Sequence, residues 1–192
     1  MATREHWEMD LNDRREILTR VIGIPEEDVT RTQRAVTKIL EGVPDGQRCL
    51  EIGAGYGRLI PYMRKHFMCA EGVDSSKNLV TMSDGSVVLT DGESIPYADN
   101  TFNLVYSFTV FQHMVDLSTI QNNLREAHRV LTPNGICRIQ TVCEDTSMYH
   151  DGHVFGSIPE FTDEFFDAGF LFVEGSVDEE IGNWIWVTAQ KD

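Results

Sequence analysis

Residues 48–57 read Arg-Cys-Leu-Glu-Ile-Gly-Ala-Gly-Tyr-Gly, and an apolar helical pattern through Leu59, Ile60 and Met63 follows directly. A short apolar strand that runs into glycines and then into a helix is typical of the first β-α turn of an open α/β sheet. The glycines permit a tight turn and let a ligand approach the backbone at the start of the helix. The stretch therefore predicts an α/β fold with a ligand site at this turn.

Two common ligands of such turns are disfavoured by the neighbouring residues. The dinucleotide fingerprint requires a small residue at position 58, where this chain has Arg58. The Gly-Lys-Ser/Thr ending of a phosphate-binding loop is also missing from the turn. The sequence thus argues against NAD, FAD and the hydrolysis of ATP or GTP.

Strand-like and helical segments alternate around the turn. A helix is expected after Pro25 and ends near Gly42, and a second one is expected at 117–131, capped by Asp116 and ended by Pro133-Asn134-Gly135. Further strands are expected at 69–74, 86–91, 102–107 and 135–142. This alternation predicts right-handed β-α-β units in a parallel sheet.

The pattern changes after residue 142. Thr162 is expected to cap a short helix that closes at Gly169. The strand-like runs 170–174 and 184–189 follow, close enough in sequence to pair as antiparallel neighbours at one edge of the sheet.

The length of the chain indicates one domain, and its net charge disfavours some classes of binding partner. The 192 residues suit one domain, and 16 Lys and Arg against 31 Asp and Glu give a formal net charge of −15. Such acidity opposes binding to phosphate backbones and to anionic membranes. Residues 144–192 hold 12 of the acidic side chains and one basic residue, Lys191, so this quarter disfavours an anionic ligand unless its carboxylates merely solvate the surface.

The N-terminus and the cysteines indicate a cytoplasmic protein. The first ten residues carry charges throughout and lack the apolar centre of a secretory signal. The four cysteines lack Cys-x-x-Cys spacing and mostly fall in apolar strand-like segments, so we expect reduced core thiols. They are Cys49, Cys69, Cys137 and Cys143.

A family resemblance joins these observations. Glu51-x-Gly53-x-Gly55-x-Gly57 resembles motif I of the class I S-adenosylmethionine-dependent methyltransferases, in their small-molecule branch. Asp74, at the end of the next strand, stands where the family has the acid that binds both ribose hydroxyls. Residues 90–102 resemble the family's adenine-binding segment, with Asp91 as its acid and Gly92 at an alanine position. Residues 105–113 and 129–135 resemble the fourth strand with its loop and the turn into the fifth strand.

The resemblance implies a three-layer, Rossmann-like α/β fold with a seven-stranded, mostly parallel sheet whose last strand is antiparallel. It also implies S-adenosylmethionine as the methyl donor and S-adenosylhomocysteine as the product. The implied cofactor-binding residues are Glu51, Gly53, Ala54, Gly55, Tyr56, Gly57, Asp74, Ser75, Asp91, Gly92, Glu93, Ser107 and Phe108. Each assignment has an alternative. The glycines serve only strand-to-helix packing, Glu51 is a partly buried carboxylate satisfied by backbone amides, Asp74 caps the next helix, and Asp91 is only a turn residue.

The acceptor side is expected after the fourth strand and in the loop after the fifth. His113 is the candidate general base, because its ordinary pKa suits proton removal at neutral pH; packing alone is the alternative. The candidate acceptor-binding residues are Trp7, Gln112, Tyr149 and His150. No metal is expected, since His150 and His153 have no further ligand at suitable spacing.

The sequence therefore predicts a metal-independent methyltransferase that acts by in-line transfer on an oxygen or nitrogen atom of a small molecule, neutral or cationic. One domain is expected, with an N-terminal helical cap or lid (1–42), a cofactor-binding core (43–142) and an acceptor-side region (143–192), as a monomer or homodimer. No nucleic-acid or membrane partner is expected. Two alternatives stay open: an RNA or protein methyltransferase that works with a partner, and a non-catalytic regulatory subunit that binds the cofactor.

Overall fold

A computed structural model describes residues 29–114, 116–142, 155–178 and 184–192. Seven strands in these ranges form one sheet in the order β3-β2-β1-β4-β5-β7-β6. The strands are β1 (Gly46–Ile52), β2 (Phe67–Asp74), β3 (Val87–Leu89), β4 (Phe102–Ser107), β5 (Leu131–Val142), β6 (Phe172–Val177) and β7 (Trp184–Gln190). The helices are α3 (Val29–Leu40), α4 (Ile60–Met63), α5 (Lys77–Met82), the 3-10 turn η1 (Phe111–His113), α6 (Leu117–Val130) and α7 (Ile158–Asp167).

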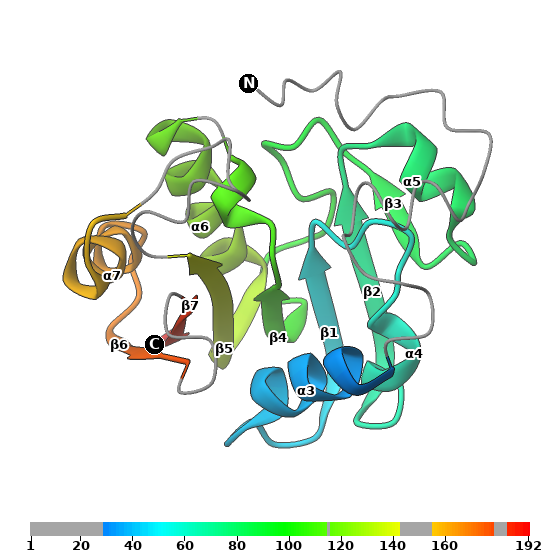
Figure 1. The fold of residues 1–192 in the computed structure, drawn as a ribbon, viewed down its shortest axis with the longest axis horizontal. Coiled ribbons are helices and arrows are strands. Elements are labelled where there is room, and N and C mark those ends of the chain that lie inside the picture. The colour runs from blue at the N-terminus through cyan, green and yellow to red at the C-terminus, as the bar shows by residue number, and fades with distance from the viewer. Residues whose placement is uncertain (1–28, 115, 143–154, 179–183) are drawn as a thin grey trace.

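The strand directions confirm the expected fold class. β1 pairs in parallel with β2 and β4, and the parallel pairing continues outward to β3 and β5. β7 is antiparallel to both of its neighbours, β5 and β6. Figure 1 shows the result, with β3 and α5 at one end of the sheet and β6 and α7 at the other. The expected antiparallel edge pair is therefore present.

Apolar side chains cover the sheet on both faces. One cluster joins the buried face of α6, including Ile120 and Leu124, and aromatic residues of α7 to Val105 and Ile139 of the sheet. A second cluster joins Ile39 of α3 and residues of α4 to the opposite face. Parallel strands require cover on both sides, and accordingly the last four residues of β1 and five of the six residues of β4 are buried.

The expected start of the helix is confirmed at α6 and wrong at α7. Asp116 caps α6, since its Oδ1 accepts the backbone N–H of Thr119 at 2.8 Å. Thr162 does not cap α7, because it lies inside the helix, where its hydroxyl donates to the Pro159 carbonyl. Ser157 is the cap and accepts the N–H of Glu160, while the Glu160 carboxylate accepts the N–H of Gly156. This reciprocal pair satisfies two N–H groups near the start of the helix, which a cap at Thr162 would leave unpaired.

The described cysteines are free thiols: Cys49 and Cys137 are buried and Cys69 is partly exposed. Cys143 lies outside the described residues. In the described part of the chain, no helix has both the length and the apolar character needed to cross a membrane.

Candidate functional site

The glycine turn after β1 adopts a backbone that side chains oppose. Gly53, Gly55 and Gly57 have φ values of 72°, 59° and 86°, in the left-handed region. A Cβ on Gly53 would also lie 2.5 Å from both methyl groups of Val110, the third residue after β4. The N–H groups of Gly53 and Ala54 donate to the Val73 carbonyl and fasten the turn to β2. At Gly55, by contrast, a Cβ would contact only Leu79, at 3.7 Å, so the backbone there has open space beside it.

Asp74 fixes this turn from the end of β2. Its Oδ2 accepts the N–H of Gly55 at 2.7 Å, and its Oδ1 accepts the N–H of Ser76 at 2.8 Å. Burial raises the pKa of this carboxyl, and the backbone N–H groups that it accepts oppose the rise. Ser76, not Asp74, caps α5 by accepting the N–H of Leu79. Ser75 is exposed beside it.

Glu51 is a buried acid at the carboxyl end of β1. It is 4% exposed, and Tyr106 of β4 donates its hydroxyl hydrogen to Oε2 at 3.2 Å. Burial raises the pKa of Glu51 to about 8, because the protein interior disfavours the charged form more than Arg58 and Tyr106 favour it. Tyr56 and Arg58 of the adjacent turn are partly exposed.

Asp91 organises the loop after β3. Its side chain is exposed, and its Oδ1 accepts the N–H groups of Glu93 and Ser94 at 2.9 and 2.8 Å. These hydrogen bonds hold the pKa of Asp91 below its ordinary value. Asn123 of α6 donates to the carbonyl of the following Gly92 at 2.9 Å, which fixes the loop from below.

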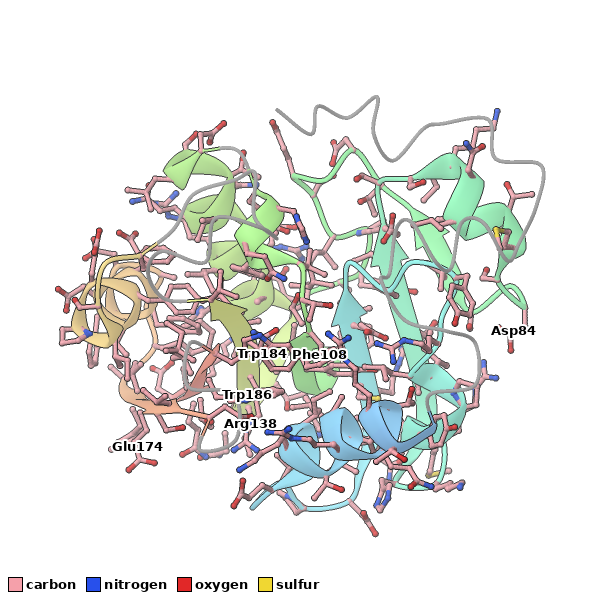
Figure 2. The ribbon with its side chains drawn as sticks, in the orientation of Figure 1. Asp84, Phe108, Arg138, Glu174, Trp184 and Trp186 are labelled. Carbon is pink, nitrogen blue, oxygen red and sulfur yellow. The ribbon has the colours of Figure 1, made fainter. Side chains whose placement is uncertain are left out.

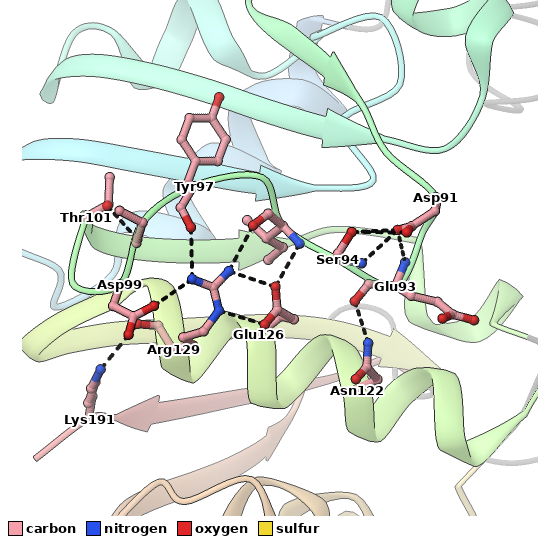
Figure 3. A network of polar contacts seen from close by, with 12 residues as sticks. Asp91, Glu93, Ser94, Tyr97, Asp99, Thr101, Asn122, Glu126, Arg129 and Lys191 are labelled. Atoms are coloured by element: carbon pink, nitrogen blue, oxygen red, sulfur yellow. Dashed lines mark hydrogen bonds and ion pairs between the residues drawn. The ribbon is translucent and has the colours of Figure 1, made fainter.

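The rest of this loop is fastened to the end of α6 (Figure 3). The Arg129 guanidinium donates to the carbonyls of Ile95 and Tyr97 and pairs with Glu126 and Asp99. Glu126 also accepts the N–H of Ile95 at 2.8 Å. The segment from Asp91 onward is thereby held by one helix at several backbone groups, which presets its shape for a ligand.

Ser107 ends β4 and Phe108 follows it, and both side chains are buried. The Ser107 hydroxyl donates to the Ile52 carbonyl at 2.9 Å and ties β4 to β1 just before the glycine turn. Phe108 stacks on Trp186 with ring centres 5.8 Å apart and meets Trp184 edge to face (Figure 2). Phe108 is 4% exposed and belongs to the apolar cluster that also contains Ile39 of α3.

The turn η1 carries Gln112 and His113. Gln112 is 5% exposed, and its Oε1 is buried without a hydrogen-bond partner in the described part of the chain. A buried acceptor of this kind favours a donor from a ligand, because an unpaired polar atom is costly. His113 is partly exposed, and its backbone N–H donates to the Val110 carbonyl.

Three candidates, Trp7, Tyr149 and His150, lie outside the described residues. Within those residues, no group of three or more His, Cys, Asp or Glu side chains could hold a metal ion. Sequence reasoning missed Val110, Asn123 and Gln140, which shape the loops of the site. A glutamine between Ile139 and Thr141 near the end of an expected strand was the available signal for Gln140.

Residues 50–139, which contain the end of β1, all of β2 to β4 and most of β5, match a family described as "Methyltransferase domain". A glycine/sarcosine/dimethylglycine N-methyltransferase of Actinopolyspora halophila is 31% identical over 126 residues, 58% of this chain and 22% of the relative. A malonyl-[acyl-carrier protein] O-methyltransferase 1 of Coxiella burnetii is 30% identical over 111 residues, 54% of this chain and 38% of the relative. The chain therefore spans well under half the length of these two relatives.

Among solved structures, a protein from Thermotoga maritima described as a SAM-dependent methyltransferase, possible histamine N-methyltransferase, has a TM-score of 0.66. The superposition covers 92% of this chain and 99% of that protein at 19% identity. The likeness extends the shared fold beyond the matched segment, to nearly the whole chain.

Proposed function

We propose that the chain is a class I S-adenosylmethionine-dependent methyltransferase that moves a methyl group from S-adenosylmethionine to an oxygen or nitrogen atom of a small molecule. The match of residues 50–139 to a methyltransferase domain supports the proposal. One observation carries the proposal. The carboxylate of Asp74 and the positive-φ glycine turn are joined by the Gly55 N–H, at the sheet edge where such folds bind ligands.

The residues of this edge fit S-adenosylmethionine. The cofactor supplies an activated methyl group on a sulfonium. Asp74 would accept hydrogen bonds from the ribose hydroxyls, and the loop of Asp91, Gly92 and Glu93 would hold the adenine. The glycine turn with Tyr56, supported by Glu51, would receive the amino-acid end, because the open side of Gly55 leaves room for a ligand against the backbone.

The acceptor is proposed to be a neutral or cationic small molecule. The two relatives named above act, by their names, on nitrogen and oxygen acceptors, which supports one of these atoms here. The acidic excess of residues 144–192 opposes an anionic acceptor. We expect in-line alignment of the acceptor and exclusion of water to supply most of the rate, without a metal. We place the reaction in the cytoplasm.

Binding and transfer test the proposal separately. Calorimetry is expected to detect S-adenosylhomocysteine binding to the intact chain, and a metabolite extract incubated with methyl-labelled S-adenosylmethionine is expected to gain a labelled product. The absence of cofactor binding would refute the assignment. Binding without any transfer, even with added protein partners, would favour a regulatory subunit.

His113 is proposed as the base that removes a proton from the acceptor. Once the extract has identified an acceptor, His113→Ala is expected to lower kcat about a hundredfold or more, as for other general bases, with cofactor affinity nearly unchanged. His66→Ala is the control, because His66 pairs with Asp45 just before β2, at the opposite edge of the sheet. Unchanged kcat in His113→Ala would remove His113 from the mechanism.

A further inference from the structure

A buried amide on β5 holds the backbone that follows β4. Gln140 is 0% exposed, and its Oε1 accepts the N–H of Thr109 at 2.9 Å. Its Nε2 donates to the carbonyl of Thr141 at 2.6 Å. Both ends of the amide are thus used on backbone groups, one beyond the end of β4 and one within β5.

Thr109 needs such support because its backbone is strained. Its φ is 59°, in the left-handed region that β-branched residues rarely adopt. The other non-glycine residues with positive φ in the described ranges are Asn100 and Asn134, and asparagine tolerates this region. Backbone strain of this kind persists where the surroundings fix it, and it gathers at functional sites.

The strained residue controls what comes directly after it. Val110 lies against Gly53, where its methyl groups fill the space that a Cβ on the glycine would need. The Val110 carbonyl then accepts the N–H of His113 and starts η1. One backbone position therefore sets both the wall of the glycine turn and the path of the segment that carries Gln112 and His113.

We propose that Gln140 is a positioning residue that, through Thr109, holds Val110 against the glycine turn and so shapes the site for the amino-acid end of the methyl donor. The inference rests on the proposed function. It assigns to β5 a part in cofactor binding, although Gln140 itself is buried away from the ligand. If Gln140, which lies opposite Trp186 of β7, served only to stabilise the fold, replacing it would weaken the binding of all ligands alike.

Two ligands separate these roles. S-adenosylhomocysteine carries the amino-acid end, and 5′-methylthioadenosine lacks it. Gln140→Met is expected to lower the affinity for S-adenosylhomocysteine about tenfold. This corresponds to about 1.4 kcal/mol, the size of one lost hydrogen bond. The affinity for 5′-methylthioadenosine is expected to stay within about twofold of wild type. Gln140→Glu, whose protonated form can make both hydrogen bonds, is expected to restore most of the selective loss. Equal weakening of both ligands, or weakening of neither, would overturn the inference.

The strain itself can be tested by a second substitution. Thr109→Gly adopts the same φ without strain, so Gln140→Met in that background is expected to cost less than about threefold in S-adenosylhomocysteine affinity. If Gln140→Met lowered S-adenosylhomocysteine affinity tenfold both with Thr109 present and in the Thr109→Gly protein, the proposed role of Gln140 would be contradicted. Arg138→Met is the matched control, because Arg138 is also a polar residue of β5 but donates to the carbonyls of Lys38 and Glu41. It is expected to leave the ratio of the two affinities unchanged.

Wild-type protein gives a readout that needs no variant. Amide hydrogen exchange across residues 109–113 is expected to slow when S-adenosylhomocysteine binds and to stay unchanged with 5′-methylthioadenosine. Equal slowing by the two ligands would refute a role at the amino-acid end. If the wild-type protein bound neither ligand, the proposed function itself would be refuted. That result differs from one in which both ligands bind but Gln140→Met shows no selective effect.

Discussion

Asp74→Ala is expected to weaken S-adenosylhomocysteine binding by about 1–3 kcal/mol, the range for hydrogen bonds to a charged group. The carboxylate would lose its contact with the ribose and, at the same time, its hold on the N–H groups of Gly55 and Ser76. The glycine turn would keep its hydrogen bonds to the Val73 carbonyl and the one from the Gly57 N–H to the Ala54 carbonyl, but it would lose its side-chain anchor at Gly55. Isothermal calorimetry measures the loss directly.

Asp74→Asn separates the two parts of this effect. The amide has one oxygen, so it can accept one of the two backbone N–H groups that the carboxylate accepts on separate oxygens. Its affinity is expected to fall between wild type and Asp74→Ala. Lys77→Ala, at an exposed position at the start of α5, serves as the control for nearby surface change. An Asp74→Ala protein that folds and binds S-adenosylhomocysteine like wild type would contradict the ribose assignment.

The fold was open to prediction because its signals are local. β4 occupies the expected residues 102–107, and Asp116 caps α6 through a side chain three residues from its partner. The start of β5 differs for a non-local reason. Residues 133–135 were expected to end a helix and precede the strand, yet β5 begins at Leu131, because Leu131 pairs with Phe102 before an irregularity in the register.

The motif residues of the site could be predicted from the sequence, but the residues that hold them in place could not. Glycines and acids at the ends of strands mark the turn and Asp74 in the sequence. The contact of Gln140 with Thr109 joins a residue of β5 to one in the loop after β4, 31 positions away, and no local pattern pairs them. The left-handed φ of Thr109 was equally hidden, because threonine normally indicates the opposite preference.

Glu51→Gln is expected to stabilise the fold at pH 8 and to have little effect near pH 4.5. The pKa of Glu51 is about 8 in the folded protein against an ordinary value of 4.5, so the folded state holds this proton more tightly than the unfolded state. Wild type therefore loses stability as the pH rises from 4.5 to 8, and glutamine carries no such loss. At about 1.4 kcal/mol per pKa unit, the difference approaches about 4 kcal/mol at pH 8.

Denaturant unfolding at several pH values checks this expectation. Glu71→Gln is the control of opposite sign, because the partly exposed Glu71 pairs with Arg48, which holds the pKa of Glu71 below its ordinary value against the opposing effect of burial. It is expected to destabilise modestly at both pH 5 and pH 8, since the Glu71 carboxylate contributes its stability above its unfolded pKa. A Glu51→Gln protein that is less stable than wild type at pH 8 would show that Glu51 is ionised and satisfied in the folded state.

The same proton links Glu51 to the methyl donor. S-adenosylmethionine carries a positive sulfonium and an amino group, and a cation placed near Glu51 favours the ionised carboxylate. Below pH 8, wild type must then release a proton when the cofactor binds, so affinity rises with pH up to about the pKa of Glu51. Calorimetry at pH 7 in buffers of different ionisation enthalpy counts that proton. Glu51→Gln is expected to lose the release and most of the pH dependence, and equal proton release from both proteins would place the titrating group elsewhere, on Asp74 or on the cofactor's own amino group.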